Sequence, residues 1–151
     1  METDAEFTDA LATELFGLEL RRLTTASVTA SITRAIVRMA RGYGWHVRTE
    51  ARVEVPLAVG AGWAEQLGFV DVLVSRGRPF PDVAIEIDST DKPWSVLKLQ
   101  HVAAAGMHAI WVRWGDDLWA GVYEDIDVIQ LPTLRRARSR PSANQLTVWL
   151  R

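Results

Sequence analysis

Three acidic residues and two lysines lie close together in the middle of the chain. Asp71 interrupts one apolar run, and Glu86 and Asp88 interrupt the next. Lys92 and Lys98 follow shortly after and are the chain's two lysines. Carboxylates bind hard cations such as Mg²⁺, Mn²⁺ and Ca²⁺, and a lysine can place a compact charge beside a reacting water. These residue types therefore predict a site for metal-assisted chemistry.

The three carboxylates are expected on one face of a sheet. Side chains alternate along a strand, so Glu86 and Asp88 point the same way, with α-carbons about 6.6 to 7 Å apart. In a suitable register, Asp71 would stand about 4.8 Å away on the neighbouring strand. Two ionised carboxylates about 7 Å apart repel by about 2.4 kcal/mol at an effective dielectric near 20. A raised pKa, a basic neighbour or a divalent cation must compensate.

A plain alternative is that these acids form the wet face of an antiparallel strand pair. Asp71 and Glu86, however, each lie within a run of Val, Ile and Leu. Such runs are typical of a largely covered sheet, where an acid needs a functional or electrostatic reason. The pattern therefore favours a functional site.

A helix over about residues 94–105 follows the acidic strand, because Pro93 can start it and Gly106 can end it. Its apolar stripe leaves Lys98 and His101 on another face, where both could lean toward one target. A surface lysine and a capping or core histidine are the alternatives, and the latter is favoured for His101. Lys92, in the preceding loop, could equally reach the acids, so both lysines remain candidates.

The rest of the chain predicts an α/β domain. Apolar spacing indicates helices over residues 8–23 and 28–39, and alternation indicates strands over residues 45–55, 69–75, 82–88 and 108–114. The last two strands are joined by a helix and should be parallel. Residues 118–123 and 145–150 could each add a strand. The order helix, three strands, helix, strand predicts a mixed sheet flanked by helices.

Composition limits the kinds of chemistry and partner. The 151 residues suit one domain, and the absence of cysteine excludes disulfides and thiolate ligands and fits a cytoplasmic protein. No apolar run reaches the roughly 18 to 20 residues of a membrane span. The net charge of −2 gives no global attraction to nucleic acid. A local basic cluster is either a phosphate-contacting patch or a solvated loop: Arg135, Arg136, Arg138 and Arg140.

The acidic segments resemble the PD-(D/E)XK nuclease superfamily, whose restriction-endonuclease-like core runs helix, three strands, helix, strand. Its motif is an Asp on the second strand followed by Asp/Glu-x-Lys on the third. The segment containing Asp71 matches the first part, and Ile85-Glu86-Ile87-Asp88 matches the second except that aspartate holds the lysine position. This form resembles the very-short-patch-repair endonuclease branch. The resemblance covers about residues 28–115, leaving an N-terminal helix and a C-terminal extension.

The resemblance implies one nuclease-like domain over residues 1–151 that hydrolyses phosphodiester bonds, most simply of DNA, with Mg²⁺ or Mn²⁺. Asp71 and Glu86 would ligate the metal, with the carbonyl of Ile87 as a further ligand. Asp88 would add another ligand or act as general base. The metal would activate water and stabilise the phosphoryl group.

The resemblance also gives a role to a lysine. In the superfamily the lysine can migrate to the next helix, which nominates Lys98, with Lys92 as the other candidate. Either would position the water or stabilise developing negative charge. Family members often carry another acid on the first helix or strand, for which Glu50 is the candidate. Cutting both strands would favour a homodimer.

Aspartate at position 88 also supports two other interpretations. A nuclease fold without its lysine can persist as a catalytically inactive module that binds nucleic acid or a protein through its tryptophans and its arginine cluster. A structural subunit of a larger complex would instead expose an apolar patch around Trp111, Trp114 and Trp119. In an inactive binding module, substitution of the acids should leave binding intact.

Overall fold

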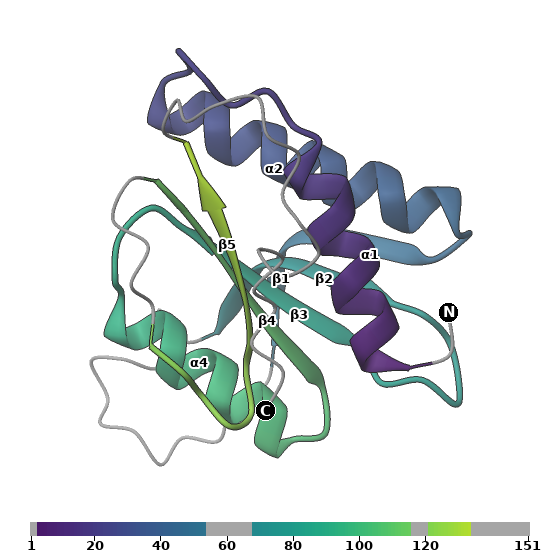
Figure 1. The fold of residues 1–151 in the computed structure, drawn as a ribbon. Coiled ribbons are helices and arrows are strands. Elements are labelled where there is room, and N and C mark those ends of the chain that lie inside the picture. The colour runs from purple at the N-terminus through teal and green to yellow at the C-terminus, as the bar shows by residue number, and fades with distance from the viewer. Residues whose placement is uncertain (1–2, 54–67, 116–120, 134–151) are drawn as a thin grey trace.

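The computed structural model describes residues 3–53, 68–115 and 121–133. In these residues, three helices and five strands form an α/β fold (Figure 1). Their order is α1 (Asp4–Phe16), α2 (Thr25–Gly42), β1 (His46–Arg52), β2 (Phe69–Ser75), β3 (Val83–Asp88), α4 (Pro93–Ala104), β4 (His108–Gly115) and β5 (Asp127–Pro132). The predicted α/β class is confirmed. None of the described helices is long and apolar enough to cross a membrane.

The strands form one mixed sheet in the order β1-β2-β3-β4-β5. The pairs β1–β2 and β2–β3 are antiparallel, whereas β3–β4 and β4–β5 are parallel. Helix α4 connects β3 to β4, as a parallel pair requires. The predicted parallel pairing of these two strands is therefore confirmed.

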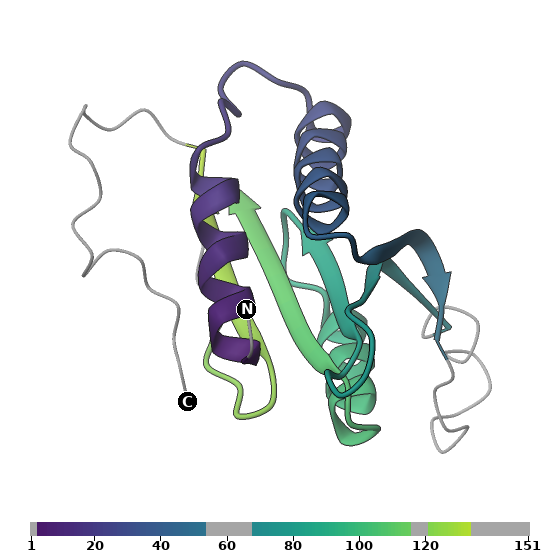
Figure 2. The ribbon, with the colours of Figure 1, turned by 90° about the vertical axis from the view of Figure 1, so that its right-hand side faces the viewer.

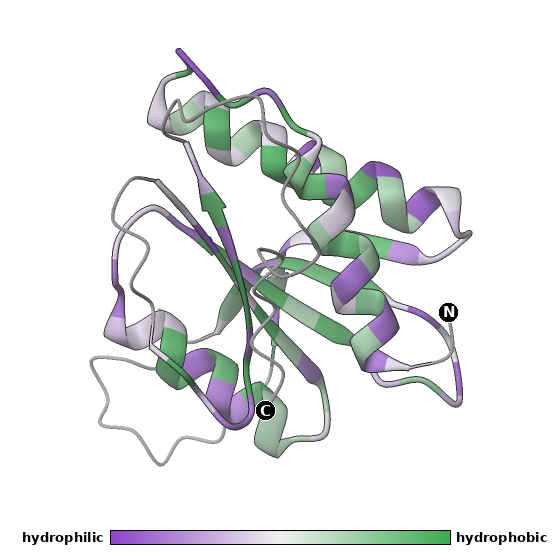
Figure 3. Ribbon diagram, viewed as in Figure 1, coloured by the Kyte–Doolittle hydropathy of each residue, from purple (hydrophilic) through white to green (hydrophobic). Residues whose placement is uncertain are grey.

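Helices cover both faces of this sheet. Helices α1 and α2 pack on one face, where Val83, Ile85 and Ile87 of β3 point, and α4 packs on the other, with Ala84. Figure 2 shows the arrangement from the side: α1 lies beside β5, and α2 lies over β1, β2 and β3. The central strands are mainly hydrophobic in Figure 3. The acids of β3 therefore lie on the face that α4 covers.

Helix α1 begins earlier and ends earlier than the apolar spacing predicted. It begins at Asp4 because Thr3 and Glu6 form a capping box, and it ends at Phe16 with Gly17 as its C-cap. Phe7, Leu11 and Leu15 are buried, one turn apart. Leu23, the predicted last apolar contact, is 41% exposed. The predicted extension of this helix to residue 23 was therefore wrong.

The last strand also differs from the prediction. Residues 121–123 are not in a strand, whereas β5 at Asp127–Pro132 pairs with β4. All but two of the residues of β5 are buried, so the segment lacks the alternation of a half-exposed strand. Residues 145–150 and the arginine cluster at 135–140 lie outside the described residues.

The tryptophans of β4 belong to the core. Trp111 and Trp114 are only 1% and 8% exposed, and Trp119 lies outside the described residues. Trp94, on α4, is 38% exposed. An apolar interaction patch built on Trp111 and Trp114 is therefore wrong, and the interpretation of this segment as a core strand is confirmed.

A buried polar cluster fixes α1 against the sheet. The Thr8 hydroxyl donates to Asp127 Oδ2 at 2.7 Å and lies 3.2 Å from His108 Nε2. His108 Nε2 lies 2.9 Å from the same carboxylate oxygen. All three residues are buried, so each depends on the others to satisfy its polar atoms.

Replacing Thr8 by valine should therefore destabilise the fold. Thr8→Val keeps the shape of the side chain but removes the hydroxyl, so the buried Asp127 carboxylate loses the hydrogen bond that Thr8 donates. We expect the free energy of unfolding in urea to fall by about 1 to 3 kcal/mol. Thr13→Val is the matched control, because Thr13 is exposed on the same helix and should change stability by less than about 0.5 kcal/mol. Equal effects of the two substitutions would contradict this role.

Candidate active site

Asp71 and Glu86 meet where the β2–β3 ladder ends. The ladder's last pair is Val72 with Ile85, and Asp71 and Glu86 stand one step further in the same register. Here the side chains replace the ladder bonds. The Ile87 amide donates to Asp71 Oδ2 at 2.7 Å, and the Asp71 amide donates to Glu86 Oε1 at 3.2 Å. These bonds hold the two carboxylates beside each other.

Burial makes the ionised forms of Asp71 and Glu86 unfavourable. Glu86 is only 4% exposed, and burial, followed by the charge of Asp71, raises the pKa of Glu86 to about 7. Burial also raises the pKa of Asp71, although the bond from the Ile87 amide opposes that rise. The protonated form of Glu86 is therefore favoured well above the usual range of a glutamate. A cation between the two groups would favour the ionised form of both.

The structure separates the roles of the two lysines. Lys98, on α4, is 6% exposed, and its Nζ lies 2.9 Å from Glu86 Oε1. The Ser95 hydroxyl, three residues earlier on the same helix, lies 3.4 Å from Glu86 Oε2. Lys92 instead lies 2.6 Å from Asp88 Oδ1, and this hydrogen bond is the main reason that its pKa is raised. Of the two lysines, Lys98 is therefore the one that contacts the acid pair directly.

Asp88 is engaged by other groups. Its Oδ2 accepts the Trp111 indole N–H at 2.9 Å, its Oδ1 contacts Lys92, and its carbonyl accepts an Arg113 N–H at 3.2 Å. In the described residues, no three His, Asp or Glu side chains are placed to hold one metal ion. Asp88 nevertheless lies close enough for its charge to help raise the pKa values of Asp71 and Glu86. Trp111 and Lys92 hold the carboxylate of Asp88, which leaves the pair of Asp71 and Glu86.

Three residues from the neighbouring strands β1 and β4 lie near Asp71, Glu86 and Asp88. Glu50 stands opposite Asp71, between the register pairs Thr49–Val72 and Ala51–Val70, and its charge helps to raise the pKa of Asp71. Glu50 is exposed and has a positive φ of 46°. Trp111 and Arg113 are register partners of Glu86 and Asp88 on β4.

The contacts of Ser95 with Glu86, and of Trp111 and Arg113 with Asp88, were not predicted from the sequence. A signal existed for Ser95, because it precedes Lys98 by three residues and therefore shares its helix face. The tryptophan and the arginine could be found only from the register of β3 and β4. That register joins residues more than twenty positions apart in the chain.

The acid pair fits a divalent cation. Magnesium in proteins is commonly held by one or two carboxylates together with waters and substrate phosphates. Asp71 and Glu86 supply two carboxylates on a covered sheet face, and both have pKa values raised in a way that a cation would reverse. Lys98 Nζ, 2.9 Å from Glu86 Oε1, supplies a positive charge beside the pair.

The raised pKa of Glu86 predicts a loss of stability as pH rises. An unperturbed glutamate, as in the unfolded chain, has a pKa of 4.5, whereas in the folded protein the pKa of Glu86 is about 7. Below 4.5 it is protonated in both states, and between these values only the unfolded chain releases the proton, which favours unfolding. The difference in unfolding free energy between the native chain and Glu86→Gln should fall by about 3 kcal/mol from pH 4 to pH 8. Urea unfolding in EDTA across this range measures it, and a pH-independent difference would contradict the raised pKa.

No protein-family model, curated protein or solved structure matches this chain. Its function must therefore be inferred from the acid pair, the buried lysine beside it and the sheet face on which they lie.

Proposed function

We propose that the protein is a metal-dependent nuclease with a restriction-endonuclease-like core, and that it hydrolyses phosphodiester bonds of DNA with Mg²⁺ or Mn²⁺. The observation that carries this proposal is the pair formed by half-buried Asp71 and buried Glu86, at the end of the β2–β3 ladder, with Lys98 Nζ 2.9 Å from Glu86 Oε1. Carboxylates that share a covered site and have raised pKa values are typical of functional centres.

The arrangement of elements supports the proposal. In the resemblance noted from the sequence, the superfamily core runs helix, three strands, helix, strand. Helix α2, strands β1 to β3, helix α4 and strand β4 follow this order. The acids lie on the second and third of these strands, and Lys98 lies on the following helix. Lys98 on α4 would then take the role of the lysine that the motif places on the third strand.

Each residue has a distinct task in the proposed reaction. Water adds to phosphorus, the P–O ester bond breaks, and the leaving oxygen takes a proton. A bound metal ion would supply Lewis acidity, which lowers the pKa of the attacking water and stabilises the phosphoryl oxygens. Asp71 and Glu86 would hold this ion. Lys98 has three N–H donors and uses one on Glu86, so two remain for the water or a phosphoryl oxygen.

One observation favours a second function. The ammonium of Lys98 already compensates Glu86, and both side chains are nearly inaccessible, at 7% and 5% exposure. A site neutralised in this way also suits a catalytically inactive module that binds nucleic acid or a protein. In such a module the acid pair would stabilise the fold rather than hold a metal.

A cleavage assay tests the nuclease proposal. Supercoiled plasmid, linear duplex, single-stranded DNA and RNA are incubated with the native chain in Mg²⁺, Mn²⁺ or EDTA. We expect cutting of DNA in either metal and none in EDTA. Retention of DNA without cutting in any condition would overturn the nuclease and support the binding module. Sedimentation of the protein with duplex DNA tests the proposed homodimer, which cutting of both strands would favour.

A further inference from the structure

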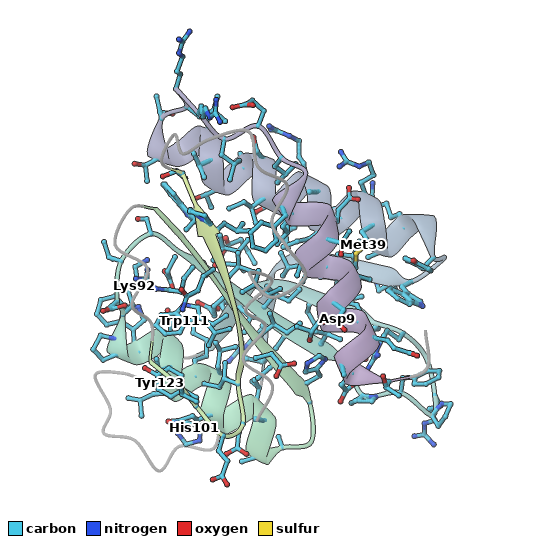
Figure 4. The ribbon with its side chains drawn as sticks, in the orientation of Figure 1. Asp9, Met39, Lys92, His101, Trp111 and Tyr123 are labelled. Carbon is cyan, nitrogen blue, oxygen red and sulfur yellow. The ribbon has the colours of Figure 1, made fainter. Side chains whose placement is uncertain are left out.

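A pocket of about 500 Å³ lies beside the acid pair. It is formed by the start of α4 and by the segment that leads into β5, and its lining includes Asp91, Lys92, Val96, Leu97, Trp111 and Tyr123. Figure 4 shows Lys92, Trp111 and Tyr123 on one side of the molecule, while Asp9 and Met39 lie on α1 and α2. The pocket and the helices α1 and α2 are therefore on opposite faces of the sheet.

Asp88 connects this pocket to the acid pair. One of its carboxylate oxygens accepts the Trp111 indole N–H at 2.9 Å, and the other lies 2.6 Å from Lys92 Nζ. Asp88 and Glu86 share one face of β3, about 7 Å apart. Trp111 is also the register partner of Glu86 on β4. The wall of the pocket is thus continuous with the place where the metal would be held.

The lining suits a flat, neutral ring. Tyr123 is half-buried and supplies the accessible ring, which meets the edge of the buried Trp111 ring at a centroid distance of 6.0 Å, and the aliphatic side chains of Val96 and Leu97 complete apolar walls. The volume lies within the usual range for small-molecule sites, about 300 to 1,000 Å³. At the rim, the Lys92 ammonium can donate and the Asp91 carboxylate can accept hydrogen bonds.

The charges around the pocket are balanced. Lys92 is paired with Asp88, and Arg113 is paired with Asp91 at 2.8 Å. Among the described residues that line the pocket, no unpaired cation is placed to hold a phosphate, which would face the carboxylate of Asp91. A nucleobase has no net charge, carries donors and acceptors at its edge, and stacks on aromatic rings.

We propose that this pocket receives one unstacked nucleobase of the strand that is cut at Asp71 and Glu86. The proposal rests on the proposed nuclease function and names its substrate class: DNA with an unpaired nucleotide, either single-stranded or in a bulged duplex. Extruding a paired base costs unpairing and unstacking energy, and an already unpaired base avoids most of that cost. The enzyme should therefore prefer an unpaired nucleotide.

Binding in EDTA tests the pocket without any cleavage. The probes are fluorescein-labelled duplexes, either fully paired or with one bulged nucleotide. We expect the native chain to bind the bulged duplex at least about tenfold more tightly. Leu97→Phe, which fills the pocket, and Tyr123→Ala, which removes a stacking ring, should abolish this preference. Gln100→Phe, at an exposed position of the same helix, should keep it.

The outcomes separate this proposal from the nuclease proposal. If the native chain cuts DNA but binds both duplexes equally, the pocket proposal fails and the nuclease stands. If it cuts nothing but prefers the bulged duplex in a way that the pocket variants remove, the nuclease fails and the base pocket stands. If a tryptophan-containing peptide binds and Leu97→Phe blocks it, while no duplex preference exists, the pocket serves a protein side chain and our proposal is overturned.

Discussion

Asp71→Asn is expected to lower metal-dependent DNA cleavage by at least about 1,000-fold. Asparagine offers a neutral amide oxygen in place of a carboxylate, so the proposed metal site would lose one of its two anionic oxygen ligands. Metal ions contribute several kcal/mol of charge stabilisation to reactions of this kind, and each 1.4 kcal/mol is about tenfold in rate. Initial cleavage rates in Mg²⁺ and Mn²⁺ measure the effect, and Mn²⁺ titration by calorimetry should show the matching loss of affinity.

The same substitution should leave the fold intact. In the native protein the Ile87 amide donates to Asp71 Oδ2 at 2.7 Å, and the amide oxygen of asparagine can still accept this hydrogen bond. The substitution also removes a buried charge that repels Glu86. The thermal unfolding temperature in EDTA should therefore stay the same or rise.

Asp9→Asn is the matched control for Asp71→Asn, because Asp9 is an exposed acid on α1, on the other side of the sheet (Figure 4). It should change neither cleavage nor metal affinity. A loss of less than tenfold in Asp71→Asn would mean that the acid pair is not the site of catalysis. A loss of activity together with unfolding would instead assign Asp71 to the fold.

Local periodicity explains why part of this site was predictable. Glu86 lies within a strand, and period-two alternation places it on the face opposite Ile85 and Ile87, which point toward α1 and α2. Lys98 lies on a helix that proline begins, and that helix covers the same face. These features depend on neighbours a few residues apart, so short patterns record them.

The roles of Asp88 and Lys92 could not be read from such patterns. The Asp88 carboxylate accepts a hydrogen bond from Trp111, which lies 23 positions later in the chain. Trp111 comes next to β3 only because β4 pairs with β3 in parallel. Which lysine reaches Glu86 depends on how α4 docks on the sheet. Both facts are tertiary, and no spacing within one element encodes them.

The errors at the chain's ends have different causes. Thr3 and Glu6 have the spacing of a capping box, which marks the start of α1 in the sequence. The prediction instead followed the apolar spacing of Leu11, Leu15, Leu18 and Leu23, which indicates a later start and a later end. Strand β5 was hidden, since Asp127 is buried by pairing with Thr8 and His108 and so breaks the expected pattern of a strand. A buried polar residue looks like a loop residue until its partners are known.

Lys98→Met is expected to lower cleavage by about 100-fold or more, while the affinity for Mn²⁺, measured at a pH where that affinity has reached its plateau, stays the same or increases. Removal of one preorganised charge at a developing oxyanion typically costs about 100- to 1,000-fold. Lys98 is the cation that contacts Glu86, so its loss removes that charge from the acid pair. It also removes a positive charge that would repel the metal. Cleavage rates and Mn²⁺ calorimetry on the same variant separate these two effects.

The pH dependence gives a second test of Lys98. Its charge and its hydrogen bond both lower the pKa of Glu86, which is nevertheless raised to about 7. Without Lys98 the pKa of Glu86 should rise further, so Mn²⁺ must compete with a proton at higher pH. The pH at which Mn²⁺ affinity reaches its plateau should therefore move upward in Lys98→Met.

Lys92→Met is the matched control, because it removes the chain's other lysine from a side chain that is 39% exposed and paired with Asp88. It should lower cleavage by less than about tenfold, since Lys92 is paired with Asp88 and not with Asp71 or Glu86. If Lys92→Met abolishes cleavage and Lys98→Met does not, the reacting charge lies at Asp88, near the position where the family motif has its lysine. Lys98 would then be the structural counter-ion of Glu86, and α4 would cover the site without taking part in the reaction.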